Sequence, residues 1–248
     1  MSNDYSRREF LTTATAGAML AALSPETLAA PPAAEPAPTA PIPTAFAAGH
    51  APKPLPFDPA KLDGISEKLI RSHWENNYGG AVNALNAVKQ RLLPALEDAS
   101  LPPYLYNELK REQLLRTGSV VLHELYFGNL GREGAPDAAL RQRLGAAFGS
   151  GDTWEKEFKR MGVGLGGGSG WVTLGYNLHT GLLENYWHWD HLHAPSATLP
   201  ILVMDMYEHA YQMDYGAAAP TYVDAFVRNI RWETVAERLD KALQARTS

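Results

Sequence analysis

The sequence predicts an α+β fold in which long helices come first and short strands follow. Apolar residues recur at helical spacing over 66–93 and 104–130, and Pro94 and Pro102-Pro103 separate the two stretches. After residue 170 the pattern changes to short apolar runs divided by turn residues, which is typical of strands. We therefore expect a helical domain over 56–148 and a mixed domain over 149–248.

The first expected helix begins at Ser66, which can cap it with Glu67 in the first turn. The pair Gly79-Gly80 is expected to kink it. Pro94 and the acidic residues that follow should end it. The prolines at 102 and 103 then open a second helix over 104–130, so the two should pack as an antiparallel hairpin.

Each of these helices directs one histidine toward its apolar side. His73 lies beside Ile70 and Trp74, and His123 lies beside Val120 and Tyr126. Taken singly, such a histidine is more often a hydrogen-bonded core residue than a metal ligand. Two of them facing each other across a hairpin are better candidates for ligands.

The second half of the chain mixes helices and strands. A helix is expected over 137–148, and a second one, capped by Asp152, should run to about Met161. The glycine-rich stretch 165–171 lacks the lysine of a phosphate loop, so we interpret it as tight packing before a strand. Three strands are expected, over 171–176, 182–187 and 201–204, with the first two forming a hairpin. Helical spacing resumes beyond Pro220.

Composition excludes several classes of function. The chain is 45% hydrophobic and 20% charged, as in globular proteins. A formal charge of −5 and a pI near 5.9 argue against nucleic acid as a partner, because binding to phosphates needs a basic face. The absence of cysteine removes disulfides, iron–sulfur clusters and thiolate zinc sites. Imidazole and carboxylate remain as strong ligands, and they suit manganese, iron or a His/Asp zinc site.

The N-terminus carries a pattern for export. Residues 6–11 read SRREFL, and a weakly apolar stretch follows to Leu23, which matches a twin-arginine signal. We expect a signal peptide over 1–30 and a periplasmic or extracellular protein, with no stable membrane span because the apolar run is too short. Residues 31–55 are rich in proline and alanine and should form an extended, unpacked linker. Cleavage after Ala30 or after Ala47 fits equally well.

The run Ile201–Met204 ends on Asp205, and His209 follows four residues later. Because the run is too apolar to face water, Asp205 should be delivered into a buried site. A buried carboxylate needs a cation, and a metal ion held with His209 is one solution. A hydrogen bond between Asp205 and His209 in an ordinary core is the alternative.

Taken together, these segments resemble the iron/manganese superoxide dismutase family. The segments that carry the resemblance are SHWENNY (72–78), LHELYF (122–127), GSGW (168–171), DMYEHAY (205–211), PTY (220–222) and RW (231–232). They span roughly residues 55–243. The family's fold is a helical hairpin followed by an α/β domain with a three-stranded antiparallel sheet, in agreement with the elements expected above.

The resemblance implies one manganese or iron ion per subunit, bound by four residues and a solvent molecule. The four residues are His73, His123, Asp205 and His209. It also implies that superoxide is the substrate, and that Glu208 reaches across a homodimer to His209 of the other subunit. Trp171 is expected close to the ion. The position that contacts the metal-bound solvent in the family is best matched by His188, although the segment 186–193 allows a shift of register. His191 and His193 could be surface loop residues or a separate weak metal site, and we favour the loop for both.

The chain departs from the family around the substrate funnel. Asn77 replaces a histidine, and Gln212 replaces the tyrosine that bonds it from the partner, so an amide pair could substitute. Ala81 replaces a tyrosine, which leaves the funnel wider or filled by Tyr78. Ala219 replaces an arginine that attracts the anion.

We therefore expect an exported superoxide dismutase whose altered funnel changes the rate of the reaction. The alternative is a metal-binding protein of the same fold with little dismutase activity, acting as a metal carrier or a slow redox protein. The departures at Ala81, Gln212 and Ala219 motivate that alternative.

Overall fold

The computed structural model describes residues 41–132 and 134–247, and Ile42–Ser248 form one compact unit. The expected signal peptide and residues 31–40 of the expected linker lie outside the described residues. The boundary expected at 148/149 falls between two helices of the same unit. The division into a helical and a mixed domain stays a prediction.

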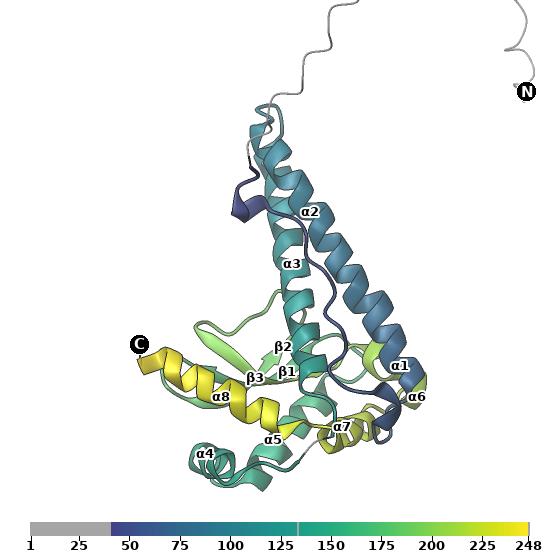
Figure 1. Cartoon of the computed structure of the whole chain (residues 1–248), viewed down its shortest axis with the longest axis vertical. Helices are drawn as coiled ribbons and strands as arrows, with labels where there is room; N and C mark the ends of the chain where they lie inside the picture. The colour runs from purple at the N-terminus through teal and green to yellow at the C-terminus, as the bar shows by residue number, and fades with distance from the viewer. Residues whose placement is uncertain (1–40, 133, 248) are drawn as a thin grey trace, which may run out of the picture. The chain divides into compact units, whose positions relative to one another are not determined.

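The helical hairpin forms as expected (Figure 1). Its first arm is a continuous helical run made of α1 (Glu67–Ser72), a π-helical segment η3 (His73–Tyr78) and α2 (Gly79–Glu97), and its second arm is α3 (Pro103–Gly128). The hydroxyl of Ser66 accepts a hydrogen bond from the Leu69 amide, which confirms the predicted cap. The irregularity expected at Gly79-Gly80 lies one turn earlier, as the π-helical segment.

Pro94 does not end the first arm, contrary to expectation, because α2 continues to Glu97. A proline removes one helical hydrogen bond, and only one turn of helix remains beyond it, so little backbone pairing is lost. The chain then turns through a hydrogen bond from Leu101 N to Asp98 O of 3.0 Å.

Residues 47–58, which we call the N-terminal strap, pack along the hairpin between the short 3-10 helices η1 (Thr44–Phe46) and η2 (Pro59–Lys61) (Figure 1). The amides of Gly49 and His50 donate to Asn86 Oδ1 at 2.9 and 3.0 Å, and Asn86 Nδ2 donates to the carbonyl of His50. The expectation of an unpacked linker is therefore wrong for the described residues before 56. An extended proline-rich chain leaves its backbone groups free, and side chains of the hairpin bond them.

Two helices connect the hairpin to the sheet: α4 (Ala138–Phe148) and α5 (Gly151–Gly164). Asp137 caps α4 by accepting from the Leu140 amide at 2.7 Å, and the helix lies where it was expected. The cap of α5 is Ser150, which accepts from the Thr153 amide, and the predicted cap Asp152 lies in the first turn instead. A serine one residue outside the helix can reach the free amides that Asp152, already helical, cannot.

The three expected strands form one antiparallel sheet in the order β2-β1-β3. They are β1 (Trp171–Asn177), β2 (Leu183–His188) and β3 (Thr198–Asp205). Trp171 on the central strand lies opposite both His188 and Asp205. Residues Ile201–Asp205 are completely buried, as the apolar run predicted.

Four helical segments complete the unit: η4 (Glu208–Ala210), α6 (Gln212–Tyr215), α7 (Ala219–Arg228) and α8 (Trp232–Thr247). The helical spacing beyond Pro220 belongs to two helices, α7 and α8. Ile230 lies between them and forms an isolated antiparallel β-bridge with Leu130. Asn229 stabilises this break through bonds to Asp63 and to the carbonyl of Ala225.

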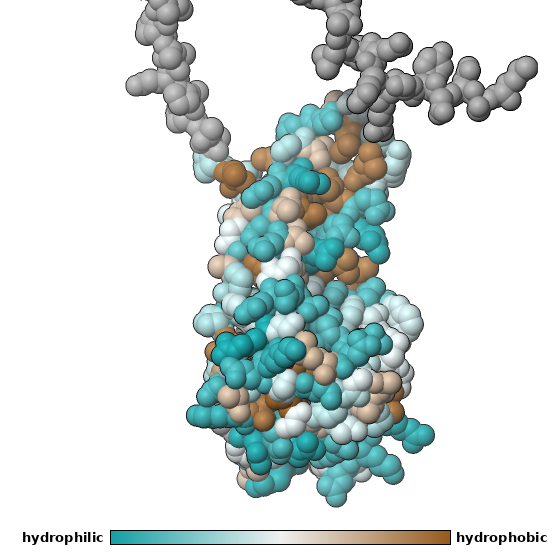
Figure 2. All heavy atoms as spheres, turned by 90° about the vertical axis from the view of Figure 1, so that its right-hand side faces the viewer, coloured by the Kyte–Doolittle hydropathy of each residue, from teal (hydrophilic) through white to brown (hydrophobic). Residues whose placement is uncertain are grey.

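Exposed apolar residues gather on the hairpin. In Figure 2 hydrophobic atoms are prominent on its upper part, whereas the sheet-bearing part is mainly hydrophilic in that view. The exposed apolar side chains of the hairpin include Leu96, Tyr104, Leu105, Leu114 and Val121. Within the described residues, no helix combines the length and the apolar character needed to cross a bilayer.

Candidate metal centre

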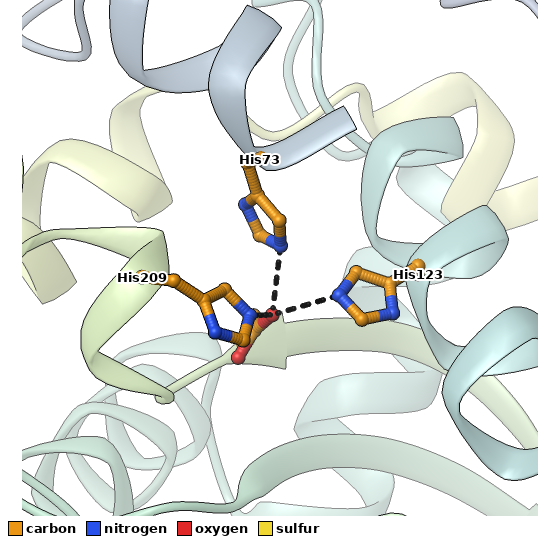
Figure 3. Close-up of side chains that lie close together, drawn as sticks. His73, His123 and His209 are labelled. Carbon is orange, nitrogen blue, oxygen red and sulfur yellow. Dashed lines mark hydrogen bonds and ion pairs between the residues drawn. The ribbon is translucent and has the colours of Figure 1, made fainter. Parts of the chain in front are cut away.

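Four side chains from four separate elements meet at the junction of the hairpin and the sheet (Figure 3). His73 is the first residue of η3, His123 lies on α3, Asp205 ends β3 and His209 lies in η4. One possible ligand atom from each lies within 4.8 Å of the others. Asp205 Oδ2 is 3.1 Å from His73 Nε2, 3.3 Å from His209 Nε2 and 3.7 Å from His123 Nε2.

Hydrogen bonds fix the orientation of two of these groups. The carbonyl of Ser119, one turn earlier on α3, lies 2.7 Å from His123 Nδ1. A carbonyl only accepts, so Nδ1 carries the proton and Nε2 presents its lone pair to the cluster. Asp205 Oδ1 accepts from the Tyr207 amide at 2.8 Å, and this leaves Oδ2 to face the imidazoles.

The cluster contains a hydrogen bond between His209 Nε2 and Asp205 Oδ2 at 3.3 Å, but it lacks the further bonds that a closed polar core would have. Both ring nitrogens of His73 and Nε2 of His123 are buried without a hydrogen bond of good geometry in the described structure. Buried polar atoms are normally paired, so convergent unpaired nitrogens around a buried carboxylate indicate a site for a cation. Three imidazoles and one carboxylate are donors that iron and manganese accept.

Electrostatics places these groups in the protonation state that metal binding requires. Burial lowers the pKa of His73, and burial together with the charge of His73 lowers the pKa of His123 to about 3. Burial opposes the charge of Asp205, but His209 and His73 outweigh it and hold the pKa of this carboxyl well below its usual range. The rings of His73 and His123 are therefore neutral and Asp205 is ionised at neutral pH, as ligands must be.

Comparison with known proteins agrees with this geometry. Residues 136–238 match the family model for iron/manganese superoxide dismutases, C-terminal domain. An iron superoxide dismutase of Cupriavidus metallidurans is 52% identical over 192 residues, which cover 77% of this chain and 97% of that protein. The chain belongs to the iron/manganese superoxide dismutase family. An iron enzyme of Aquifex aeolicus is 36% identical over 75% of the chain and 90% of that protein, and a manganese enzyme of Haloferax volcanii is 31% identical over 77% and 96%.

The bonds of His188 do not favour the role that the resemblance implies for it. This residue ends β2, where its Nε2 lies 3.0 Å from the Thr173 hydroxyl and its Nδ1 lies 2.7 Å from the carbonyl of His193. Both ring nitrogens are engaged, so His188 has none to offer to a solvent on the metal.

His191 lies in the loop after β2, as expected, but it is partly buried beside the cluster and not on the surface. Its ring stacks on Tyr207 at 4.6 Å and is 5.9 Å from the ring of His123. The indole nitrogen of Trp171 donates to His191 Nδ1 at 3.1 Å. Trp171, completely buried and 5.1 Å from His123, thus lies near the site as expected and also holds His191.

Gly118 on α3 permits this placement of His191. A side chain at residue 118 would put its Cβ 1.9 Å from the carbonyl oxygen of His191, a distance that no packed structure tolerates. A glycine inside a long helix usually has a packing reason. The sequence does not show which residue that glycine contacts.

The other funnel residues lie around the cluster at different depths. Tyr78 is buried, with its ring 6.3 Å from His123, and its phenol is bonded to Lys53 and Glu124. Asn77 is partly buried, whereas Glu208 and Gln212 are exposed on either side of His209. His209 is the most open of the four cluster residues, with 25% of its side chain exposed against 0 to 2% for the others. The cluster therefore approaches the surface at His209.

Proposed function

We infer that this chain is a superoxide dismutase that holds one iron or manganese ion per subunit through His73, His123, Asp205 and His209. The observation that carries this conclusion is the convergence of four ligand atoms, with buried unpaired nitrogens, in a chain of this family. An ion held there would supply a one-electron couple, through which one superoxide would be oxidised to oxygen and a second, taking up two protons, would be reduced to hydrogen peroxide. The charge of Asp205 offsets part of the charge of the ion.

His191 is the residue best placed to handle a proton beside the ion. The indole of Trp171 can only donate, so Nδ1 of His191 accepts and the neutral ring carries its proton on Nε2. Burial lowers the pKa of His191 and keeps this ring neutral at neutral pH. His191 therefore offers one N–H donor, which suits a small anion or the solvent that such a site binds.

Metal-specific activity tests this function. Purified protein should contain about one iron or manganese ion per chain and should remove superoxide when loaded with at least one of these metals. The alternative, a metal carrier or slow redox protein, predicts full metal content with no superoxide removal above the free metal. The relatives and the complete ligand cluster give that alternative no support.

The two histidines of the β2–β3 connection are expected to behave differently when replaced. His191→Ala should lower the dismutation rate per bound ion by about tenfold or more, because groups that contact ligands or bound solvent typically contribute at this level. His188→Gln should keep the rate and lose about 1 kcal/mol of stability, because its bonds to Thr173 and His193 are structural. Steady-state rates normalised to metal content, with urea unfolding of both variants, measure these effects. If only His188→Gln lost activity, His188 and not His191 would be the residue that contacts the metal-bound solvent.

We propose that the chain forms a homodimer in which Glu208 contacts His209 of the other subunit. The exposed position of Glu208 and the partial exposure of His209 support this arrangement. Gln212, also exposed, could pair with Asn77 of the partner. Sedimentation should show a dimer for the wild type and weakened association for Glu208→Ala. A monomeric wild type at micromolar concentration would refute the proposal.

We also propose export by the twin-arginine route, which the SRREFL motif at residues 6–11 supports. This route carries folded proteins, so the metal would be inserted before export. Replacing Arg7 and Arg8 by lysine should retain the protein in the cytoplasm. Unchanged export of that double variant would exclude the route.

A further inference from the structure

We propose that Lys53 of the N-terminal strap is a positioning residue for the metal centre. This inference rests on the proposed function, and it extends the site to a segment that lies before the first helix. Lys53 clamps the two arms of the hairpin at the level of their metal ligands.

Lys53 contacts each arm at the residue that follows a ligand. Its carbonyl accepts from the Trp74 indole nitrogen at 2.8 Å, and Trp74 directly follows His73. Its ammonium pairs with the carboxylate of Glu124, and Glu124 directly follows His123. One residue of the strap therefore links the helical turns that carry two of the four ligands.

A third contact closes the network through Tyr78. The amide of Lys53 donates to the Tyr78 hydroxyl at 2.8 Å, and that hydroxyl donates to Glu124 Oε1 at 3.0 Å. The ring of Tyr78 lies 6.3 Å from His123 and 6.1 Å from Phe127. A shift of the strap would therefore move an aromatic ring that packs beside a ligand.

The clamp holds the segment that most needs external support. Trp74 and Tyr78 lie near the two ends of the π-helical segment η3, which begins with His73. π-Helical turns are rare and occur mostly as single turns at functional sites, where the surrounding structure must hold them. The main-chain groups of Lys53 bond to the side chains of Trp74 and Tyr78 on this turn. The bond from the Tyr78 hydroxyl to Glu124 then joins the turn to α3, so the network positions His73 relative to His123.

The main-chain contacts of Lys53 should matter more than its ammonium. The side chain of Lys53 is 72% exposed, and an ion pair in water contributes little. The amide bond to Tyr78 is partly buried, so its loss leaves the phenol without one of its two partners. This difference separates positioning by the strap from a general effect of surface charge.

Three variants and one control test the clamp. Lys53→Met removes the ammonium and keeps the main-chain bonds, whereas Lys53→Pro also removes the amide donor. Tyr78→Phe removes the acceptor without changing the backbone, which protects the test if the proline variant fails to fold. Lys159→Met is the control, because Lys159 forms partly exposed ion pairs with Glu155 on α5 and Asp224 on α7, away from the strap.

The measurement is the rate at which full-length protein loaded with iron or manganese releases its metal to an excess of chelator. We expect release to be about threefold to tenfold faster for Lys53→Pro and Tyr78→Phe, about twofold or less for Lys53→Met, and unchanged for Lys159→Met. Release at the wild-type rate from both Lys53→Pro and Tyr78→Phe would overturn the proposal.

A second readout separates failure of the clamp from failure of the proposed function. If the wild type retains neither iron nor manganese, the dismutase assignment fails. Cobalt(II) then serves as the probe, because its absorption bands report ligand geometry whatever the activity. Altered bands in Lys53→Pro and Tyr78→Phe, but not in Lys159→Met, support the clamp, and identical bands in all variants contradict it.

Discussion

Asp205→Asn is expected to abolish stable metal binding, with the metal content falling from about one ion per chain to less than about a tenth. Asp205 is the only anionic member of the cluster, and its Oδ2 lies within 3.7 Å of all three ligand imidazoles. Its charge would compensate the ion from a completely buried position, where bulk water does not screen it. An amide of the same shape cannot supply this charge.

The fold should survive this substitution. Asparagine at residue 205 can still accept the bond that Oδ1 receives from the Tyr207 amide, and the neighbouring imidazoles of His73 and His123 are already neutral. Circular dichroism and elemental analysis of the same sample would show a folded, metal-free protein. The matched control is Asp190→Asn, which should keep its metal, because Asp190 Oδ1 accepts from the Leu192 amide in the adjacent loop. A folded Asp205→Asn protein that retains a full complement of iron or manganese would refute the assignment of this ligand.

Gly118→Ala is expected to destabilise the protein by about 1 to 3 kcal/mol and to lower the dismutation rate per bound ion by about tenfold. Alanine normally stabilises a helix relative to glycine, so the sign of the effect is diagnostic. The added Cβ would lie 1.9 Å from the carbonyl of His191, and α3 or the β2–β3 connection must move to relieve the overlap. Either movement displaces the His191 ring from His123.

Gly145→Ala provides the matched control for this prediction. Gly145 lies inside α4, and a Cβ there has no neighbour within 4 Å. The same substitution should therefore increase the free energy of unfolding by about 0.5 to 1 kcal/mol and leave activity unchanged. Urea unfolding and metal-normalised rates for both variants measure the contrast. Equal stabilisation by both alanines would show that His191 does not lie against α3 as described.

The parts of this fold that follow from periodicity could be predicted from sequence. The hairpin, the cap at Ser66 and the three strands depend on local patterns of apolar and capping residues, and the structure confirms them. The buried position of Asp205 followed from the apolar run that precedes it. The four candidate ligands could be named because their motifs are specific, and the structure brings them together.

The parts that depend on tertiary contacts could not be predicted in this way. Three histidines occur within six residues at 188–193, and the contacts that select His191 come from Trp171, Tyr207 and Gly118, which are distant in sequence. The strap has the composition of an unpacked linker, yet Asn86, Trp74 and Tyr78 bond its backbone. Neither arrangement leaves a periodic pattern in the local sequence.

Anomalous diffraction from a crystal of the native protein, recorded at the iron and manganese absorption edges, tests the central claim most directly. The account predicts one anomalous peak per chain, bonded to Nε2 of His73, His123 and His209 and to Oδ2 of Asp205. A protein that contains iron or manganese but shows its peak elsewhere, or a native protein that binds neither metal, would contradict it.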